Sequence, residues 1–397
     1  FRSALYANSS GSNNSAVGQN ALANNATGGD NTAVGKSALD FNTTGAQNTA
    51  VGSLALDANS TANNNTAVGY ASLTTNTTGA ENTALGRSAL QQNTTGGNNT
   101  AVGYDSLVLN TTGVNNVAVG NYALDANTIT HNNTAVGYAA FSANTDSTNT
   151  AVGQSAMQNN TTGSFNAALG NVALANNTTG NANAAFGTFA LDASTTGSSN
   201  TGLGYGALSA NTTASSNTAV GTNAMLANTT GTQNTAVGTN ALDACTTGSN
   251  LTVIGYDADA SSATATNEIT LGNSSVSTLR CNTQTISSLS DARDKTDVQE
   301  LPEGLAFIDN LNPVKFQWQT RDGNGKDGTY EAGFIAQELQ SAQQDADADY
   351  LGLVMDSNPD RLEAAYGRLV PVLVKAVQEL SAKNTALEAR IAALEAA

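Results

Sequence analysis

A glycine recurs every 17 residues between positions 18 and 255, and each one closes a short run such as Asn99 to Gly103. The spacing drops to 16 residues once, between Gly137 and Gly153, where a loop residue is missing while the flanking positions stay in register. A solenoid tolerates such a deletion because each coil contacts only its neighbours. The repeated glycines are Gly18, Gly35, Gly52, Gly69, Gly86, Gly103, Gly120, Gly137, Gly153, Gly170, Gly187, Gly204, Gly221, Gly238 and Gly255. They predict a solenoid with one coil per repeat.

Each repeat is too short for a pair of helices, and its composition favours extended structure. Thr, Val, Asn and Gly suit strands and turns, and corners such as Asn76 to Gly79 have the sequence Asn-Thr-Thr-Gly. Glycine accepts a positive φ angle in such a corner, and asparagine forms turns that stack from coil to coil. We expect two strands and two turns per coil, with one Val and one Leu buried. Residues 1–256 are therefore predicted to form a β-solenoid.

The core of this solenoid is predicted to be thin, because only 5% of the residues in the chain are aromatic. A globular protein of this size normally buries more large apolar side chains than one Val and one Leu per coil. Three chains packed side by side would bury a second face, lined by Ala and Val about a shared axis. The sequence therefore predicts a homotrimer.

The repeats resemble the left-handed β-roll heads of trimeric autotransporter adhesins, which carry similar Asn-Ser/Thr-x-Ala-x-Gly and Ala-x-Gly cores but usually have shorter repeats. The register also extends backwards, because residues 3–5 match residues 37–39 and the next glycine position falls on Phe1. We therefore expect the chain to open within a repeat, as a fragment of a longer protein or after processing.

Charge and residue usage argue against several kinds of partner. The formal net charge is −17 and no basic stripe is present, so we expect no nucleic-acid binding. No apolar run is long enough to span a bilayer, so we expect no membrane insertion. His131 is the only histidine, and Cys245 and Cys281 are too few for a disulfide framework or a zinc site. The sequence predicts no metal and no cofactor.

Other functions of the repeat fit its sequence less well. Threonine columns on a flat face can bind ice, but the Thr pairs here lie beside Gly in the corners. Calcium-binding repeats carry Gly-Gly-x-Gly-x-Asp, which does not accompany the Asp residues that follow Ala-Leu here. The Asn-Thr-Thr corners satisfy the N-glycosylation sequon, which matters only in a eukaryotic host. A polysaccharide depolymerase needs paired carboxylates in a cleft, and single scattered Asp residues do not supply them.

The 17-residue period fails after Tyr256. Residues 265–272 and 276–280 alternate apolar and polar side chains, which is typical of short strands. These strands look like the neck that ends many phage tail fibres. We therefore assign residues 257–286 to a β neck.

Four motifs follow one another in the last part of the chain. They begin at Ser290 with Ser-Asp-x-Arg-x-Lys and continue at residues 311–318, 332–339 and 369–380. In this order they resemble the intramolecular chaperone auto-processing domain of phage tailspikes and tail fibres, the peptidase S74 family. The resemblance covers residues 287–397, and implies a small α+β domain that trimerises, guides folding of the preceding β-structure and cleaves itself off. An acidic stretch at residues 343–360 departs from the pattern, and we expect it to enlarge a loop.

The resemblance implies that Ser290 is the nucleophile of that cleavage and Lys295 its general base, with Leu289 and Asp291 next to the serine. A lysine can take a proton from a hydroxyl only if it is desolvated enough to lose its own. Helix neighbours lie three or four residues apart, so a spacing of five predicts a turn between the two. The cleaved bond stays open. Attack on the preceding carbonyl has the easier ring geometry, but the serine of another subunit could reach the bond to Asp291.

A heptad pattern runs through residues 369–397. One seam holds Leu at every seventh position, and the other holds Val, Val, Asn and Ile. The two seams are Leu373, Leu380, Leu387 and Leu394, and Val370, Val377, Asn384 and Ile391. Such a pattern needs partner helices, so we predict a coiled coil. The alternative is one amphipathic helix on the surface.

These features predict a mainly β chain: a trimeric β-solenoid of 17-residue coils, followed by a small α+β chaperone domain that ends in the coiled coil. The function that fits is a structural fibre of a virion or an extracellular fibre, similar to a tail fibre or tailspike. Its expected partner is a host cell-surface glycan or protein receptor, and its only expected activity is single-turnover self-cleavage. The alternative is the head of a bacterial trimeric adhesin at the cell surface.

Overall fold

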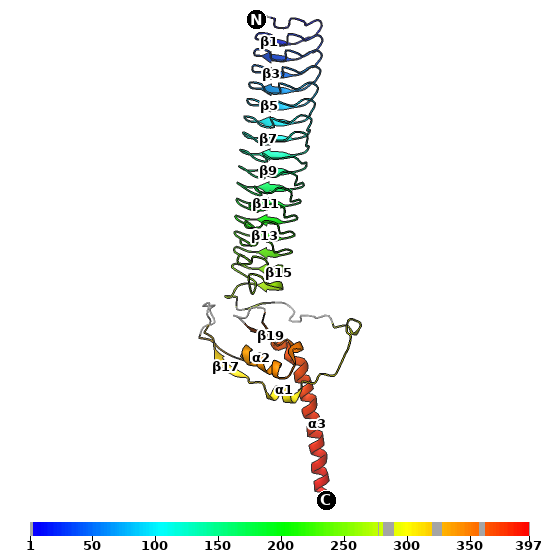
Figure 1. Ribbon diagram of the computed structural model, residues 1–397, viewed down its shortest axis with the longest axis vertical. Coiled ribbons are helices and arrows are strands. Elements are labelled where there is room, and N and C mark those ends of the chain that lie inside the picture. The colour runs from blue at the N-terminus through cyan, green and yellow to red at the C-terminus, as the bar shows by residue number, and fades with distance from the viewer. Residues whose placement is uncertain (1–2, 277, 281–289, 320–327, 357–361, 397) are drawn as a thin grey trace. The chain divides into compact units, whose positions relative to one another are not determined.

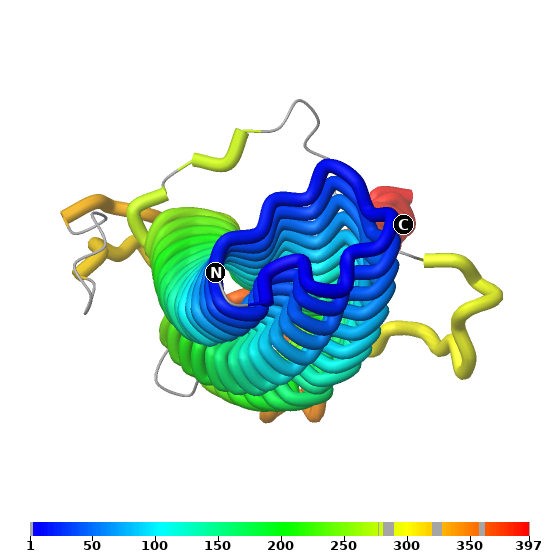
Figure 2. The backbone as a smooth tube through the Cα atoms, turned by 90° about the horizontal axis from the view of Figure 1, so that it is seen from above, coloured from blue at the N-terminus to red at the C-terminus, as the bar shows by residue number. Residues whose placement is uncertain are grey.

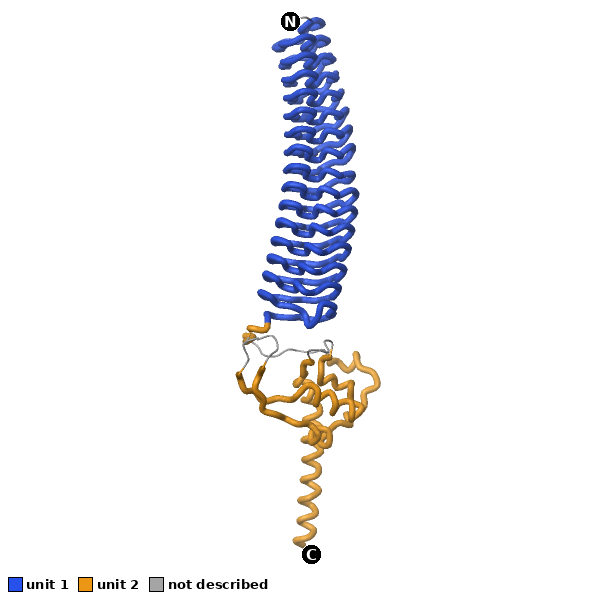
Figure 3. The backbone as a smooth tube through the Cα atoms, turned by 60° about the vertical axis from the view of Figure 1, so that its left-hand side comes forward, with its two compact units in different colours: residues 1–273 blue, residues 274–397 orange. Residues whose placement is uncertain are grey.

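The computed structural model describes residues 3–276, 278–280, 290–319, 328–356 and 362–396. The chain divides into two compact units, residues 1–273 and residues 274–397 (Figures 1 and 3). The first unit is a β-solenoid, which confirms the fold predicted from the glycine repeat. The second unit is a small mixed structure of short strands and helices with one long helix at its end. Across the described ranges, no helix is both long and apolar enough to cross a membrane.

A single parallel sheet of sixteen strands runs along the solenoid, in sequence order (Figure 1). Most strands pair with the next at an offset of 17 residues, and only β8 and β9 pair at 16, as Thr134 opposite Thr150. The three-residue strands are β1 Ser15–Val17, β2 Thr32–Val34, β3 Thr49–Val51, β4 Thr66–Val68, β5 Thr83–Leu85, β6 Thr100–Val102, β7 Val117–Val119, β8 Thr134–Val136, β9 Thr150–Val152, β10 Ala167–Leu169, β11 Ala184–Phe186, β12 Thr201–Leu203, β13 Thr218–Val220 and β14 Thr235–Val237. The missing loop residue therefore leaves the sheet intact.

The described coils contain one strand each, whereas the sequence analysis expected two. The second apolar patch of each coil is a series of turns, because some of its residues adopt the left-handed conformation. In one coil Asp105 has φ 52° and Leu107 has φ 51°. A strand needs negative φ at every residue, so this patch cannot be extended.

The sheet also continues past residue 256. Strand β15 (Ser249–Ile254) pairs with β16 (Thr266–Leu271) in parallel, with Ser249 opposite Thr266, so the offset of 17 is kept. Part of the segment assigned to a neck therefore forms a further coil of the solenoid. Residues 276 and 278–280, where a second short strand was expected, are not in a strand.

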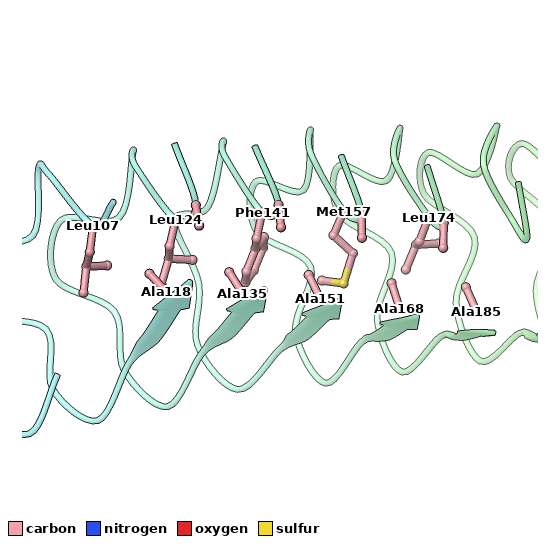
Figure 4. Close-up of a cluster of buried hydrophobic side chains, with 14 of the residues drawn as sticks. Leu107, Ala118, Leu124, Ala135, Phe141, Ala151, Met157, Ala168, Leu174 and Ala185 are labelled. Atoms are coloured by element: carbon pink, nitrogen blue, oxygen red, sulfur yellow. The ribbon is translucent and has the colours of Figure 1, made fainter. Parts of the chain in front are cut away.

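The core of the solenoid is built from Ala and Leu rather than from Val and Leu. In β6 the middle residue, Ala101, is fully buried, and Leu107 of the same coil is buried opposite the strand. Figure 4 shows the two resulting columns, with Leu107, Leu124, Phe141, Met157 and Leu174 facing an Ala column. A three-residue strand turns only its middle side chain inward. The expectation of a buried Val in each coil is therefore wrong, and Val102 points outward.

The repeated glycine is required by the close stacking of the coils, which follow one another with a small, steady shift in the view along the solenoid (Figure 2). Gly103 has φ +136°, and a Cβ atom there would lie 2.5 Å from the carbonyl oxygen of Gly120. Only glycine combines this φ angle with this approach. This explains why the glycine spacing marks the coils so regularly.

Two columns of buried asparagines connect the coils. In the strand column, the backbone N–H of Asn48 donates to Asn31 Oδ1 at 3.0 Å, and Asn31 Nδ2 donates to the carbonyl oxygen of Gly45. In the corner column, Asn110 Nδ2 donates to Asn93 Oδ1 at 2.8 Å. Buried amides need such partners, because an unpaired buried polar group costs free energy. The stacked Asn turns predicted from the repeat are thus an internal ladder.

The second unit consists of short elements that pack on the start of one long helix. They are η1 Ala292–Asp294, α1 Leu305–Asp309, β17 Val314–Gln317, β18 Tyr330–Gly333, α2 Ala336–Asp345, η2 Asp349–Leu351, β19 Val354–Met355, β20 Glu363–Ala364, η3 Tyr366–Leu369 and α3 Val370–Glu395. The pairs β17–β18 and β19–β20 are antiparallel. The core contains Phe307, Leu369 and Val372, together with residues near position 350.

The acidic stretch at residues 343–360 is more than an enlarged loop. Leu351 and Leu353 from this stretch lie in the core of the second unit. Gln343, at the end of α2, accepts a hydrogen bond on Oε1 from the backbone N–H of Leu353 at 2.6 Å. The described part of the stretch is therefore folded back onto the unit.

Helix α3 forms over the region where the heptads predict a helix. Its first turns belong to the core of the second unit, through Val372 and Ala376. The predicted seam faces outward, and Leu380 and Leu387 are 47% and 56% exposed. A partner helix for this seam remains a prediction.

Candidate functional site

The candidate cleavage segment begins with a short 3-10 helix, η1, which separates Ser290 from Lys295. Asp291 caps this helix, because its side chain accepts a hydrogen bond from the backbone N–H of Arg293 at 2.9 Å. Lys295 closes the turn, with its backbone N–H donating to the carbonyl oxygen of Ala292. The local sequence thus provides a turn at the place where the spacing of five predicts one.

This turn brings the two proposed catalytic side chains together. Lys295 Nζ donates to Ser290 Oγ at 2.6 Å. An amine at this distance is placed to accept the hydroxyl proton, provided that the amine is uncharged. Both residues are exposed in the single chain, so the described residues do not supply the burial that such a lysine needs.

Next to the pair, Asp291 and Arg293 form an ion pair across the turn. The guanidinium donates through Nε and Nη2 to both carboxylate oxygens, and the shortest distance, Nη2 to Oδ2, is 2.5 Å. These hydrogen bonds, with that from the Arg293 backbone, lower the pKa of Asp291 below its usual value of 3.8. The carboxylate beside Ser290 is therefore charged at neutral pH and paired with Arg293. Leu289, on the other side of the serine, lies outside the described residues.

The chain that follows this segment is fastened to helix α3. Glu300 forms an ion pair with Lys375, whose hydrogen bond lowers the pKa of the Glu300 carboxyl. Leu305 lies five residues after Glu300, at the start of α1. Its backbone N–H donates a hydrogen bond to Glu379 Oε2. Lys375 and Glu379 lie one turn apart on α3, and Lys375 Nζ is 3.9 Å from Glu379 Oε1.

Gly304 allows this close contact. A Cβ atom at this position would lie 2.5 Å from each carboxylate oxygen of Glu379. Gly304 and Glu379 were not singled out from the sequence. The pair Lys375 and Glu379, four apart in the last motif and off the predicted seam, was a weak signal that this helix face makes polar contacts.

In the solenoid, the described carboxylates that come closest to a pair are Asp243 and Asp259. Burial raises the pKa of Asp259, and the neighbouring Asp243 raises it further. The pKa of Asp243 is raised as well, first by burial and then by Asp257. The two carboxyl groups hydrogen-bond each other. A glycoside-hydrolysing pair is separated by about 5 Å or more so that a sugar or water fits between the groups. The direct interaction of Asp243 with Asp259 does not match that spacing.

The remaining residues singled out from the sequence are scattered. Cys245 is a buried free thiol in the corner column, and burial raises its pKa. His131 is exposed, and its Nδ1 accepts a hydrogen bond from the backbone N–H of Val114. Cys281 lies outside the described residues. Within the described ranges, no group of three or more His, Cys, Asp or Glu side chains is placed to hold a metal ion.

A comparison with protein families bears on the second unit. Residues 290–348 match the Peptidase_S74 family model, described as chaperone of endosialidase. No curated protein and no solved structure matches the chain. The matched segment begins at Ser290 and contains Lys295 and the motifs at 311–318 and 332–339. The resemblance to this family is therefore confirmed, and with the β-solenoid it supports a fibre-like or tailspike-like protein with a C-terminal chaperone region.

Proposed function

We propose that this chain is a homotrimeric tail-fibre or tailspike-like protein of a virion, and that its second unit guides assembly and then cleaves itself off. The chaperone-family match and the preceding β-solenoid support the general function. The observation that carries the cleavage is the hydrogen bond from Lys295 Nζ to Ser290 Oγ. The proposed location is the virion or the extracellular fibre.

In the proposed reaction, Ser290 Oγ attacks the carbonyl carbon of an adjoining peptide bond while Lys295 Nζ takes the hydroxyl proton. The carbon–nitrogen bond of the peptide breaks, and the protonated amine returns the proton to the leaving nitrogen. Water then hydrolyses the ester on Oγ, which restores the hydroxyl and leaves two chains. The cut lies on one side of Ser290, next to Leu289 or next to Asp291.

The exposure of Lys295 in the single chain indicates that assembly precedes cleavage. In the single chain the Lys295 side chain is exposed to solvent. We infer that a neighbouring copy buries the pair during assembly, because desolvation favours the neutral amine. Cleavage then follows assembly and reports that folding is complete.

Mass spectrometry of purified variants tests the cleavage. The wild type should be cut next to Ser290 into two fragments, and their masses show on which side of the serine the bond is broken. Ser290→Ala and Lys295→Ala should stay whole. Lys295→Arg should also stay whole, because arginine keeps the charge and the donor groups but cannot lose a proton.

Ser288→Ala is the matched control, because it removes a hydroxyl two positions away in the sequence and leaves Ser290 and Lys295 unchanged. It should be cut like the wild type. If Ser290→Ala is still cut at the same bond, the proposed nucleophile is wrong. If Lys295→Arg is cut at the wild-type rate, the proposed base is wrong.

The solenoid is proposed to be the part that stays on the virion and contacts a host cell-surface glycan or protein. The chaperone-family match favours this function over the head of a bacterial surface adhesin. Binding of the cleaved, purified solenoid to host cells, compared with cells stripped of surface glycans or treated with protease, tests the contact and separates the two receptor classes. A lack of binding to every cell type able to take up the virion would remove host contact from the proposal.

A further inference from the structure

The outer face of the solenoid sheet carries an unbroken column of apolar side chains, which we call the apolar ridge. In each three-residue strand the last residue points outward, opposite to the buried Ala. The ridge consists of Val17, Val34, Val51, Val68, Leu85, Val102, Val119, Val136, Val152, Leu169, Phe186, Leu203, Val220, Val237, Ile254 and Leu271. One residue from each of the sixteen strands therefore contributes to it.

The members of the ridge lie directly over one another. Val102 pairs with Val119 across neighbouring strands, and Val119 pairs with Val136 in the same way. They are open to solvent in the single chain, and Leu85 and Leu169 are 47% and 49% exposed. Soluble monomers rarely expose continuous apolar surface of this extent.

Charged side chains are absent from this face. The residue two positions before each ridge residue also points outward, and it is Thr in most strands and Ser, Val, Ala or Ile in the others. The acidic residues of the solenoid lie elsewhere in the coil, for example Asp105 and Asp125 in the turns. A surface that avoids charge along sixteen strands can be covered without desolvating an ion.

The size and the period of this face indicate what covers it. Two outward residues on each of sixteen strands give 32 residues, against about 20–30 per side at a standard protein interface. A partner that fills a surface repeating at every coil must itself repeat at the same distance, which is the spacing of neighbouring strands. A second copy of the same solenoid meets this condition because its coils repeat at the same spacing.

We propose that the apolar ridge is the contact between copies of the solenoid, with the copies side by side and the ridges turned toward a common axis along the fibre. This inference rests on the proposed self-association of the chain and adds the surface through which the solenoids meet. It also explains why the strand ends in Val or another large apolar residue although that residue is not part of the core of its own coil. The outward Val is the second buried face that the thin Ala and Leu core lacks.

Cysteines placed on and off the ridge test the proposal in the full chain. Val119→Cys lies on the ridge, and Thr112→Cys is the matched control, because Thr112 is an exposed corner residue of the preceding coil. In the assembled protein a short bismaleimide should link Val119→Cys into covalent pairs on a denaturing gel and leave Thr112→Cys unlinked. A bulky maleimide should label Thr112→Cys and lose its reaction with Val119→Cys until denaturant is added. The wild type, with Cys245 and Cys281, defines the background.

A second position on the apolar ridge keeps the test decisive if one variant does not fold. Val220→Cys repeats the measurement on β13 and should behave like Val119→Cys. If the wild type is assembled by analytical ultracentrifugation but neither ridge cysteine links or is protected, the ridge is not the contact, and the proposed fibre stands without it. If the wild type, before or after cleavage, is a monomer at micromolar concentration, self-association fails and the proposed function fails with it.

Discussion

Glu379 Oε2 accepts a hydrogen bond at 2.9 Å from the backbone N–H of Leu305, although the two residues are 74 positions apart. The carboxylate thereby serves the free N–H groups at the start of α1, where Gly304 offers no side chain of its own. Because Glu379 belongs to α3, the chain just after the Ser290 and Lys295 pair is tied to the helix that carries the predicted seam. Folding of the candidate site and folding of this helix are therefore linked.

Removing this carboxylate should destabilise the second unit. We expect Glu379→Ala to lower its free energy of unfolding by about 1 kcal/mol, the usual loss for a helix cap. Trp318 is the only tryptophan and lies in this unit, so its fluorescence in a urea titration follows this unit alone. Glu388→Ala removes an exposed carboxylate from the same helix and should change little. Equal free energies of unfolding for Glu379→Ala and the wild type would show that the cap does not stabilise the second unit.

The asparagine ladder predicts a stabilising substitution. The corner column is interrupted at Ser194, and among the described residues Ser194 Oγ and Asn177 Oδ1 are buried without a hydrogen-bond partner. Asparagine occupies this position in most coils, so Ser194→Asn should fit and donate to Asn177 Oδ1. We expect a gain of about 1 kcal/mol or more, because a buried unpaired acceptor is satisfied. Denaturant titration followed by far-UV circular dichroism measures it. Ser198→Asn, which adds an amide in a nearby turn, is the control, and a destabilised Ser194→Asn would contradict the ladder argument.

The acidic pair in the last coils predicts a dependence on pH. The pKa values of Asp243 and Asp259 are raised above 3.8 in the folded chain, so the folded state binds more protons than the unfolded state just above that pH. Stability contributed by this pair therefore falls as the pH rises from 3.8 through the folded pKa values. Asp259→Asn should remove much of this fall and slow hydrogen exchange in β15 and β16 at neutral pH. Asp30 is an exposed carboxylate in an early coil, and Asp30→Asn should leave hydrogen exchange in β15 and β16 unchanged. Faster exchange in Asp259→Asn would mean that the charged pair stabilises the coil.

The solenoid could be predicted from the sequence because the geometry of each coil requires glycine at one position. Gly103 and its equivalents need both a positive φ angle and room for the next coil, so the glycine spacing shows the coil length directly. The direction of the strand side chains was not predictable in this way. A three-residue strand such as β6 has too few alternations to show whether Ala101 or Val102 faces inward, and the turn that places Leu107 opposite the strand decides it.

The candidate site was predictable only where it is local. Ser290 and Lys295 are separated by one turn, so their spacing within a family motif was enough to name them together. The contact of Glu379 with Leu305 depends on how α3 packs against α1, and no local pattern marks it. The burial that Lys295 needs was inferred from chemistry, and the single chain does not supply it.

Helix α3 predicts a separation between folding of the second unit and assembly of the fibre. Val372, Ala376 and Glu379 tie its first turns to the unit, whereas residues 381–396, including Leu387 of the seam, are exposed. A truncation after Ser381 should therefore keep the Trp318 fluorescence of the folded unit but lose the assembled form after refolding. Association of the helices raises the local concentration of the solenoids, which otherwise have to meet by diffusion. Leu387→Asp should reduce the assembled yield in the same way, and Ala389→Asp, on the opposite face of the helix, should not. The yield is measured by analytical ultracentrifugation, and a truncated chain that assembles as well as the wild type would show that the seam does not bring the copies together.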